Sequence, residues 1–118
     1  MGESFKDLVV WQRAVQMTVA IYKLTSAFPE TERFGLTNQL RRASVSVASS
    51  IAEGYGRSTK GEYLLFLGHA RGSNCEVQTQ LVISEALDFG SVESRQLADS
   101  LSVEVSKMLV AMMSKLRK

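Results

Sequence analysis

The glycine spacing between residues 56 and 61 is the first feature of this chain that could carry chemistry. The run Gly56-Arg57-Ser58-Thr59-Lys60-Gly61 separates two glycines as in a P-loop, whose backbone amides cradle nucleotide phosphates. The next residue is Glu62, where that loop requires a lysine to reach the phosphates. The residues before the run have a helical pattern rather than that of a strand. We therefore do not expect nucleotide hydrolysis.

His69 and Cys75 are the only histidine and the only cysteine, and they are the remaining candidates for a base and a nucleophile. Their offset along the chain places them on different faces of one helix, where a packed histidine and a small helical residue are the simpler interpretation. One cysteine and one histidine cannot supply the ligands of a structural zinc site. No carboxylate pair has the apolar surroundings that acid–base catalysis needs. We predict no catalytic residues, no metal and no cofactor.

The composition indicates one globular domain spanning residues 1–118. The chain has 118 residues, of which 45% are hydrophobic, and single cores usually form in chains of about 100–150 residues. A lone Cys75 cannot form an intramolecular disulfide, which favours a reducing compartment. The first residues lack the apolar stretch of a signal peptide, and the apolar run Met108–Met113 is much shorter than the roughly 20 residues that span a bilayer. We expect a soluble, cytoplasmic protein without a membrane partner.

Four segments carry apolar residues three and four positions apart, a spacing that places one apolar face along a helix. Pro29 with Gly35, residues 54–58 and residues 88–91 separate these segments, because proline and glycine interrupt regular structure. No segment alternates polar and apolar residues long enough to indicate a strand. The pattern predicts an all-α fold with helices near residues 7–27, 36–55, 60–88 and 92–116.

The same spacing predicts the side of each helix that faces a shared core. Because short connections make neighbouring helices antiparallel, we expect an up-down-up-down four-helix bundle. The predicted core positions are Val10, Ala14, Met17, Ile21, Leu24 and Phe28, then Leu36, Leu40, Ala43, Val47 and Ile51, then Leu67, Ala70, Asn74, Val77 and Leu81, and finally Leu97, Leu101, Val105, Met108, Met112 and Leu116.

Polar residues and a glycine mark the predicted helix ends. Ser4 with Asp7 three positions later can cap the first helix. Thr59 and Glu62 have the spacing of a capping box, in which each side chain bonds a backbone amide of the other residue. Gly90 can adopt the left-handed conformation that ends a helix, and Ser91 can cap the next one.

The helix over 36–55 has small residues on a second face. Ser44, Ala48 and Ala52 recur at every fourth position with Val45 beside them, and such a row allows another helix to approach closely. A lone bundle would leave one side of this helix in water. We therefore expect this face to pack against another copy of the chain in a closed ring.

The bundle topology sorts the charges toward its two ends, although the net charge is only +2. One end gathers the first residues, the second connection and the C-terminus, with Lys6, Arg57, Lys60, Lys115, Arg117 and Lys118 against Glu3, Asp7, Glu53 and Glu62. The opposite end is net acidic. A helix dipole attracts cations to a C-terminus, which would explain the last three basic residues but not Arg57 and Lys60. Ion pairs with Glu53 or Glu76 are an alternative role for some arginines.

Much of the chain resembles the four helix bundle protein family, which is associated with intervening sequences of bacterial large-subunit ribosomal RNA. The similar residues include Phe5-Lys6-Asp7-Leu8, Gln39-Leu40-Arg41-Arg42-Ala43, Ile51-Ala52-Glu53-Gly54 and Ala70-Arg71-Gly72-Ser73. Ser50 stands where the family pattern has an asparagine. The resemblance implies a homo-oligomer, most simply a homopentamer, without enzymatic activity. Relatives include the accessory variability determinant of diversity-generating retroelements, which engages reverse transcriptase and nucleic acid.

Two functions from different classes fit these observations. The first is an accessory module that binds RNA or DNA, with RNA preferred on family grounds. The second is a scaffold whose oligomer presents a repeated surface to a protein partner. The basic end favours the first function, whereas the modest net charge favours the second. The candidate nucleic-acid-binding residues are Arg41, Arg42, Arg57, Lys60, Lys115, Arg117 and Lys118.

Overall fold

Long α-helices dominate the computed structural model, which describes residues 4–118, and no strand occurs among these residues. The four long helices are α1 (Val9–Thr25), α2 (Leu36–Tyr55), α3 (Lys60–Ala86) and α4 (Val92–Arg117). Two short 3-10 helices, η1 (Phe5–Asp7) and η2 (Glu30–Glu32), precede α1 and α2. The predicted all-α class and four helices are confirmed, and the boundaries of α2, α3 and α4 differ from the predicted ones by at most two residues.

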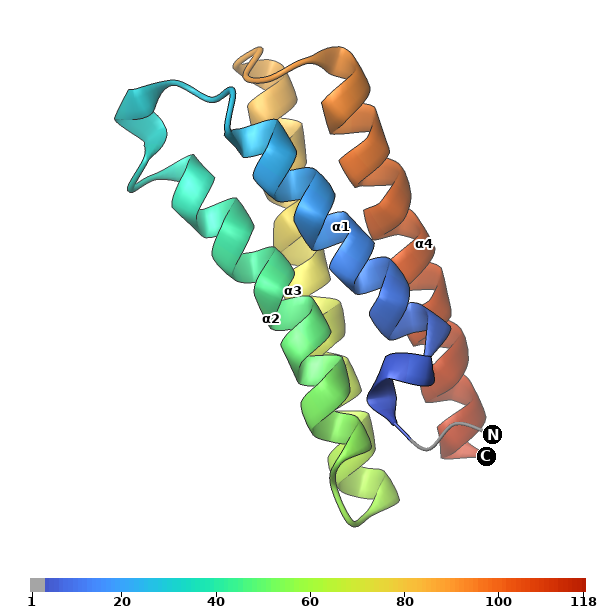
Figure 1. Ribbon diagram of the computed structural model, residues 1–118. Coiled ribbons are helices and arrows are strands. Elements are labelled where there is room, and N and C mark those ends of the chain that lie inside the picture. Colours follow the sequence, from blue (N-terminus) through green and yellow to red (C-terminus); the bar gives the residue numbers. More distant parts are fainter. Residues whose placement is uncertain (1–3) are drawn as a thin grey trace.

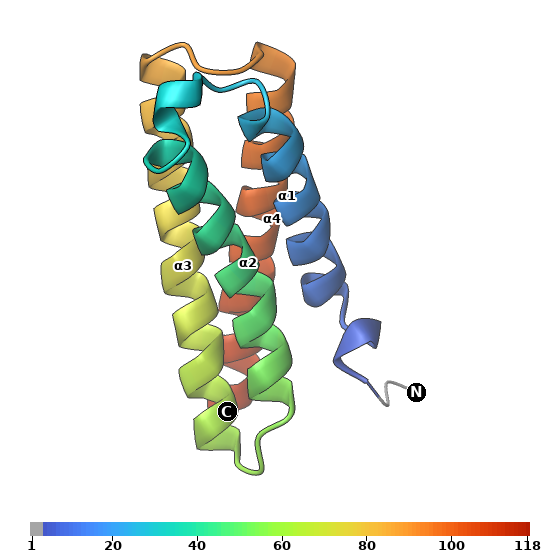
Figure 2. The ribbon, with the colours of Figure 1, turned by 60° about the vertical axis from the view of Figure 1, so that its left-hand side comes forward.

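The helices run antiparallel to their neighbours in a bundle with extents of 43 × 23 × 22 Å (Figures 1 and 2). α1 and α3 each pack against both α2 and α4, and the contact between α2 and α3 is the most extensive. Short side chains allow this close approach, since Ser46 Oγ lies 3.0 Å from Ser73 Oγ. At Gly54, a Cβ atom would lie only 2.8 Å from Phe66 Cβ. The α2–α3 pair is therefore the most tightly joined side of the bundle.

The predicted helix caps are largely confirmed. Thr59 Oγ1 accepts a hydrogen bond from the Glu62 amide at 3.1 Å, and Ser91 Oγ accepts one from the Ser94 amide at 3.1 Å. The Glu62 carboxylate accepts a bond from the Thr59 hydroxyl rather than from its amide, so only half of the predicted capping box forms. Gly90 has the predicted left-handed conformation, with a φ of 75°, but it does not end α3. That helix ends at Ala86, and the left-handed residue after its last turn is Asp88, with a φ of 57°.

The start of the first helix differs from the prediction. Ser4 Oγ accepts a bond from the Lys6 amide and caps η1, not α1. α1 begins two residues later than predicted, because Leu8 is extended (ψ 123°) and turns the chain between the two helices. This turn places the Phe5 ring edge-on to Trp11, with the ring centroids 5.3 Å apart. Packing of η1 against α1 therefore replaces a continuous first helix.

All core positions predicted for the first three helices are buried, whereas the predicted face of α4 is only partly confirmed. Val105 is buried and Leu97 is 56% exposed, while the other four predicted residues, Leu101, Met108, Met112 and Leu116, are partly buried and pack against the core. The buried face of α4 is turned by about one residue and contains Arg95, Ala98, Ser102, Val105, Leu109 and Met113. The small Ala98 and Ser102 let neighbouring helices approach, and Asn74 of α3 satisfies the buried polar groups of Ser102.

The row of small residues on α2 is divided between two roles. Ser44 is fully buried inside the bundle, where its backbone carbonyl accepts a bond from Thr18 Oγ1 of α1 at 3.1 Å. It therefore has no free surface for a second copy of the chain. Val45 and Ala52 instead line a groove between α1 and α2. Only part of the predicted packing row remains accessible.

Candidate nucleic-acid interface

The basic end of the molecule, defined as Lys6, Arg57, Lys60, Lys115, Arg117 and Lys118, lies where the sequence analysis placed it. Figure 1 shows η1, the α2–α3 connection and the end of α4 at the same end of the bundle. All six side chains are exposed. The acidic Asp7, Glu53 and Glu62 lie at this end too, and Glu3 lies outside the described residues. The cations outnumber the anions among the described residues of this end.

Arg57 is the most engaged cation of the basic end. One of its Nη atoms lies 2.9 Å from Glu53 Oε2, an ion pair between partly exposed side chains one helical turn apart. Its guanidinium also lies over the Phe66 ring, 4.6 Å from the centroid. Lys60, Lys115 and Arg117 form no ion pair with any of residues 4–118. Their charges are therefore the ones most available to a polyanion.

The adjacent arginines of α2 have different surroundings. Arg41 Nε donates to Thr25 Oγ1 at 2.9 Å, and the guanidinium lies 4.6 Å from the centroid of the Tyr22 ring. Arg41 thus braces the C-terminal turn of α1 against α2, in the way that basic side chains stabilise helix ends. Arg42 is exposed and makes no hydrogen bond or ion pair within residues 4–118. Of the two, Arg42 is the one that a ligand can bind without displacing a contact within the protein.

Of the two carboxylates considered as partners for these arginines, only Glu53 forms an ion pair. Glu76 makes none with any of residues 4–118, although it lines the same groove as Arg42. Arg41 bonds to a hydroxyl rather than to a carboxylate. The pairing of Glu53 with Arg57 follows from their spacing of one helical turn, and a carboxylate four residues before an arginine is a sequence signal for it.

Tyr63, beside the basic end, has a shifted pKa. Burial raises the pKa of the Tyr63 phenol above its ordinary value of 10.0, and the nearby Tyr55 adds to the increase. The two rings meet edge-on, with centroids 6.2 Å apart. A neutral Tyr63 therefore stabilises the junction of α2 and α3 that positions the basic connection.

Comparison with known proteins gives a family. Residues 6–111 match the 23S rRNA-intervening sequence proteins. The chain belongs to this family. A crystal structure from Bacteroides thetaiotaomicron VPI-5482, described as a protein of unknown function from the S23 ribosomal protein family, has a TM-score of 0.79 at 20% identity. The similarity covers 89% of this chain and 98% of that one, and it shows a common fold. No curated protein matches.

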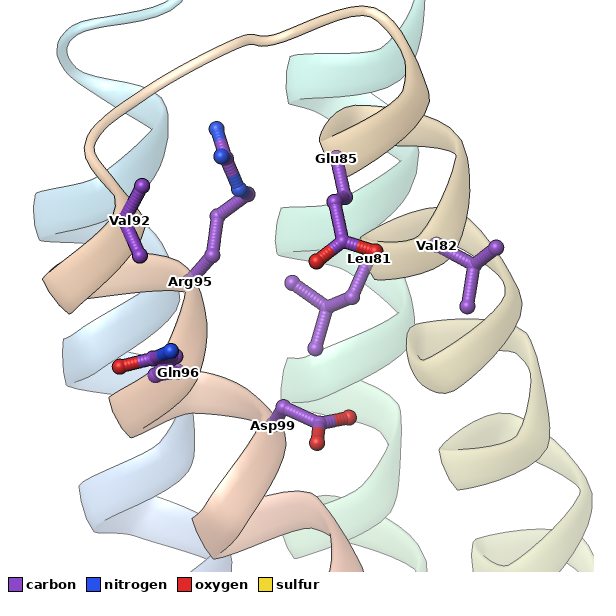
Figure 3. Close-up of a pocket in the computed structure, with 7 residues that line it drawn as sticks. All are labelled: Leu81, Val82, Glu85, Val92, Arg95, Gln96 and Asp99. Carbon is purple, nitrogen blue, oxygen red and sulfur yellow. The ribbon is translucent and has the colours of Figure 1, made fainter.

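The end of this intervening-sequence protein opposite the basic end contains a cavity of about 170 Å³ between α3 and α4 (Figure 3). Arg95 extends from α4 toward the α3–α4 connection, where one Nη donates to the Phe89 and Gly90 carbonyls at 2.7 and 2.9 Å. Glu85 and Asp99 line the same cavity. Arg95 was not among the functional residues predicted from the sequence. Arg95 has helical spacing from Ala98 and Ser102, which indicates that it is buried, but this can be recognised only when the buried face of α4 is known.

Two classes of site are absent from the part of the chain that the structure describes. No group of three or more histidine, cysteine or carboxylate side chains gathers closely enough to hold a metal ion among residues 4–118. Within the same residues, no helix has the length and apolar character to cross a membrane.

His69 and Cys75 are the histidine and cysteine considered from the sequence as a base and a nucleophile. His69 packs edge-on against Phe66, with ring centroids 5.6 Å apart, and Cys75 is exposed.

Proposed function

We propose that this intervening-sequence protein is a non-enzymatic, oligomeric accessory module of the cytoplasm that binds nucleic acid, RNA in preference to DNA. The observation that supports it best is the group of exposed cations Lys60, Lys115, Arg117 and Lys118 at one end of the bundle, which form no ion pair within residues 4–118. Such cations neutralise phosphates and release condensed counterions, whatever the base sequence. The exposed part of Arg57 extends this surface, whereas Arg42 lies about 20 Å away along α2, nearer the start of that helix, and would make a separate contact.

Assembly supplies the strength that one copy lacks. A net charge of +2 per chain is too small to hold a polyanion, but a ring aligns the basic ends of several copies and converts weak contacts into avidity. We propose a homopentamer, with the subunit number taken from the family resemblance. Its support is the groove of about 380 Å³ between α1 and α2, which Trp11, Val19, Val45 and Ala52 help to line with apolar surface. A neighbouring copy would cover it.

Mobility shifts with RNA and DNA of mixed sequence test the binding. We expect complexes at micromolar protein whose affinity decreases steeply between about 50 and 200 mM salt if six or more phosphate contacts form. Light scattering tests the ring. A measured mass equal to the monomer mass of 13.0 kDa at the same protein concentration would contradict it. A ring without any mobility shift at the lower salt concentration would favour the alternative function.

That alternative is a scaffold that presents a repeated surface to a protein partner. Large apolar side chains on the outer faces of α3 and α4 favour it, among them Leu65, Val82 and Leu97, each more than half exposed. Exposed apolar surface of this kind is typical of protein contacts. Under this alternative, substitutions at Val82 or Leu97 would abolish partner binding, whereas loss of the basic residues at the C-terminus would not.

A further inference from the structure

A polar groove of about 430 Å³ lies between α2 and α3, on the most tightly packed side of the bundle. Its volume is within the range of about 300–1,000 Å³ typical of small-ligand sites. The hydrogen-bonded Ser46 and Ser73 contribute to its lining and join the two helices there. From this pair the groove runs toward the start of α2 and along α3, past Asn38, Gln39, Arg42, Ala43, Glu76 and Gln80.

The polar side chains of this groove include four exposed ones that are free to meet a ligand and one buried amide oxygen without a partner among the described residues. Within residues 4–118, the side chains of Asn38, Gln39, Arg42 and Glu76 make no hydrogen bond or ion pair. Gln80 is only 9% exposed, and its Oε1 atom is buried without any hydrogen-bond partner. Buried polar atoms are nearly always paired, so an orphaned amide oxygen beside a polar groove points to a missing donor.

The charges of the groove define what such a ligand must offer. Arg42 presents several N–H donors in a fixed planar arrangement, and the Glu76 carboxylate presents two acceptor oxygens. The two residues come from different helices and form no ion pair with each other. A matching ligand therefore carries two adjacent acceptors for the arginine and two adjacent donors for the carboxylate.

Guanine is the nucleic-acid base with this pattern. Its O6 and N7 atoms accept a bidentate pair from arginine, the commonest specific base contact of that side chain. Its N1–H and N2–H₂ groups are adjacent donors that fit a carboxylate. Adenine and cytosine each carry a single exocyclic amino donor on the base-pairing edge and no ring N–H there, and uracil carries one ring N–H without an amino group. None of these three can donate to both oxygens of Glu76.

We propose that the groove between α2 and α3 binds a guanine base of single-stranded nucleic acid, an inference that rests on the proposed nucleic-acid function. Arg42 contacts the O6 and N7 edge, and Glu76 accepts from N1–H and N2–H₂. The terminal amide of Gln80 turns about its soft last torsion angle to accept a further donor from the ligand. Base contacts in the groove thereby add selectivity to phosphate contacts at the basic end.

Titration of the whole protein with 5′-GMP and 5′-AMP tests the groove without a polymer. Because both nucleotides carry the same phosphate, their difference reports the base alone. We expect GMP to bind more tightly by a factor on the order of ten, the discrimination of one good bidentate base contact. Equal affinities, or no binding of GMP at millimolar concentration, would overturn the proposal.

Glu76→Gln is the decisive variant, since it removes the charge and one acceptor but keeps the shape. We expect it to weaken GMP binding by a factor on the order of ten and to leave AMP binding and the melting temperature unchanged. Glu85→Gln, at an exposed position of the same helix outside the groove, is the matched control and should leave both affinities unaltered. GMP binding by the Glu76 variant at wild-type strength would contradict the assignment.

A mobility shift with polyuridine separates this inference from the proposed function. That polymer has no guanine, so its binding reports the basic end, and Glu76→Gln should not reduce it. Polyuridine binding without a GMP preference would overturn the groove assignment alone. Absence of polyuridine binding at low salt would overturn the proposed function, whatever the nucleotide titration shows.

Discussion

Asn74 of α3 and Ser102 of α4 form a reciprocal pair of hydrogen bonds in the interior of the bundle. The Ser102 hydroxyl donates to Asn74 Oδ1 at 2.7 Å, and Asn74 Nδ2 donates to the Ser102 carbonyl at 2.8 Å. Both residues are almost completely buried. Because an unpaired buried amide is costly, this pair fixes the rotation of α4 about its axis.

Ser102→Ala should lower the free energy of unfolding by about 1–3 kcal/mol, because it leaves Asn74 Oδ1 buried with one fewer donor. Urea denaturation measures the change. Thr79→Ala is the matched control, since the Thr79 hydroxyl bonds only to the Cys75 carbonyl at the surface of α3, and it should change stability by less than about 0.5 kcal/mol. Equal effects of the two substitutions would contradict the role of the buried pair.

Two glycines should respond to alanine in opposite directions. Gly90 has a φ of 75°, and a Cβ atom there would overlap the Leu24 side chain, so Gly90→Ala should destabilise the fold by about 1–2 kcal/mol or more. Gly72 lies within α3 with open space around its Cα, so Gly72→Ala should stabilise it by about 0.5–1 kcal/mol. Thermal unfolding of both variants checks the signs, and a stabilising Gly90→Ala would be the contrary result.

The adjacent arginines of α2 should separate into a structural and a ligand-facing residue. Arg41→Ala removes the bond to Thr25 Oγ1 and the contact with Tyr22, and should cost about 1–2 kcal/mol of stability. Arg42→Ala should change stability by no more than about 0.5 kcal/mol and should weaken nucleic-acid binding. Chemical denaturation and mobility shifts on the same two variants make the comparison. An Arg41→Ala protein as stable as the wild type would refute the structural role of Arg41.

Tyr63 should make the protein sensitive to alkaline pH. Its pKa in the folded protein is raised above 10.0 by burial and by Tyr55, so the folded state holds the phenolic proton more tightly than the unfolded chain does. This contribution to stability is complete below pH 10.0 and is lost as the pH rises through the higher, folded-state pKa. Melting temperatures across this window should decrease less in Tyr63→Phe than in the wild type. Parallel curves would exclude this contribution.

The C-terminal cations should contribute to binding without supporting the fold. Replacing Lys115, Arg117 and Lys118 together by alanine should weaken binding to all nucleic-acid sequences alike and reduce the salt slope by up to about three units. The melting temperature should not change, since these exposed residues end α4. Lys23→Ala, at an exposed position of the opposite end, is the control. An unaltered salt slope in the triple variant would place the phosphate contacts elsewhere.

The four helices, most of their starts and most of the core were predictable from the sequence because these features depend on local chemistry. Apolar residues at helical spacing define a buried face, and Thr59 and Ser91 mark helix starts because their hydroxyls accept from backbone amides of the first turn. The arrangement of the basic end also followed from short connections between antiparallel helices. The family resemblance agrees with the match over residues 6–111.

Tertiary packing alone decided the rotation of α4 and the different surroundings of Arg41 and Arg42. The α4 sequence has apolar residues on two overlapping faces, and the choice between them depends on Asn74, which lies 28 positions away from Ser102. Consecutive residues of a helix point about 100° apart. Arg41 therefore meets the end of α1, while Arg42 faces the groove beside α3. Contacts between helices, which no local pattern encodes, determine which of two identical side chains supports the fold and which is left for a ligand.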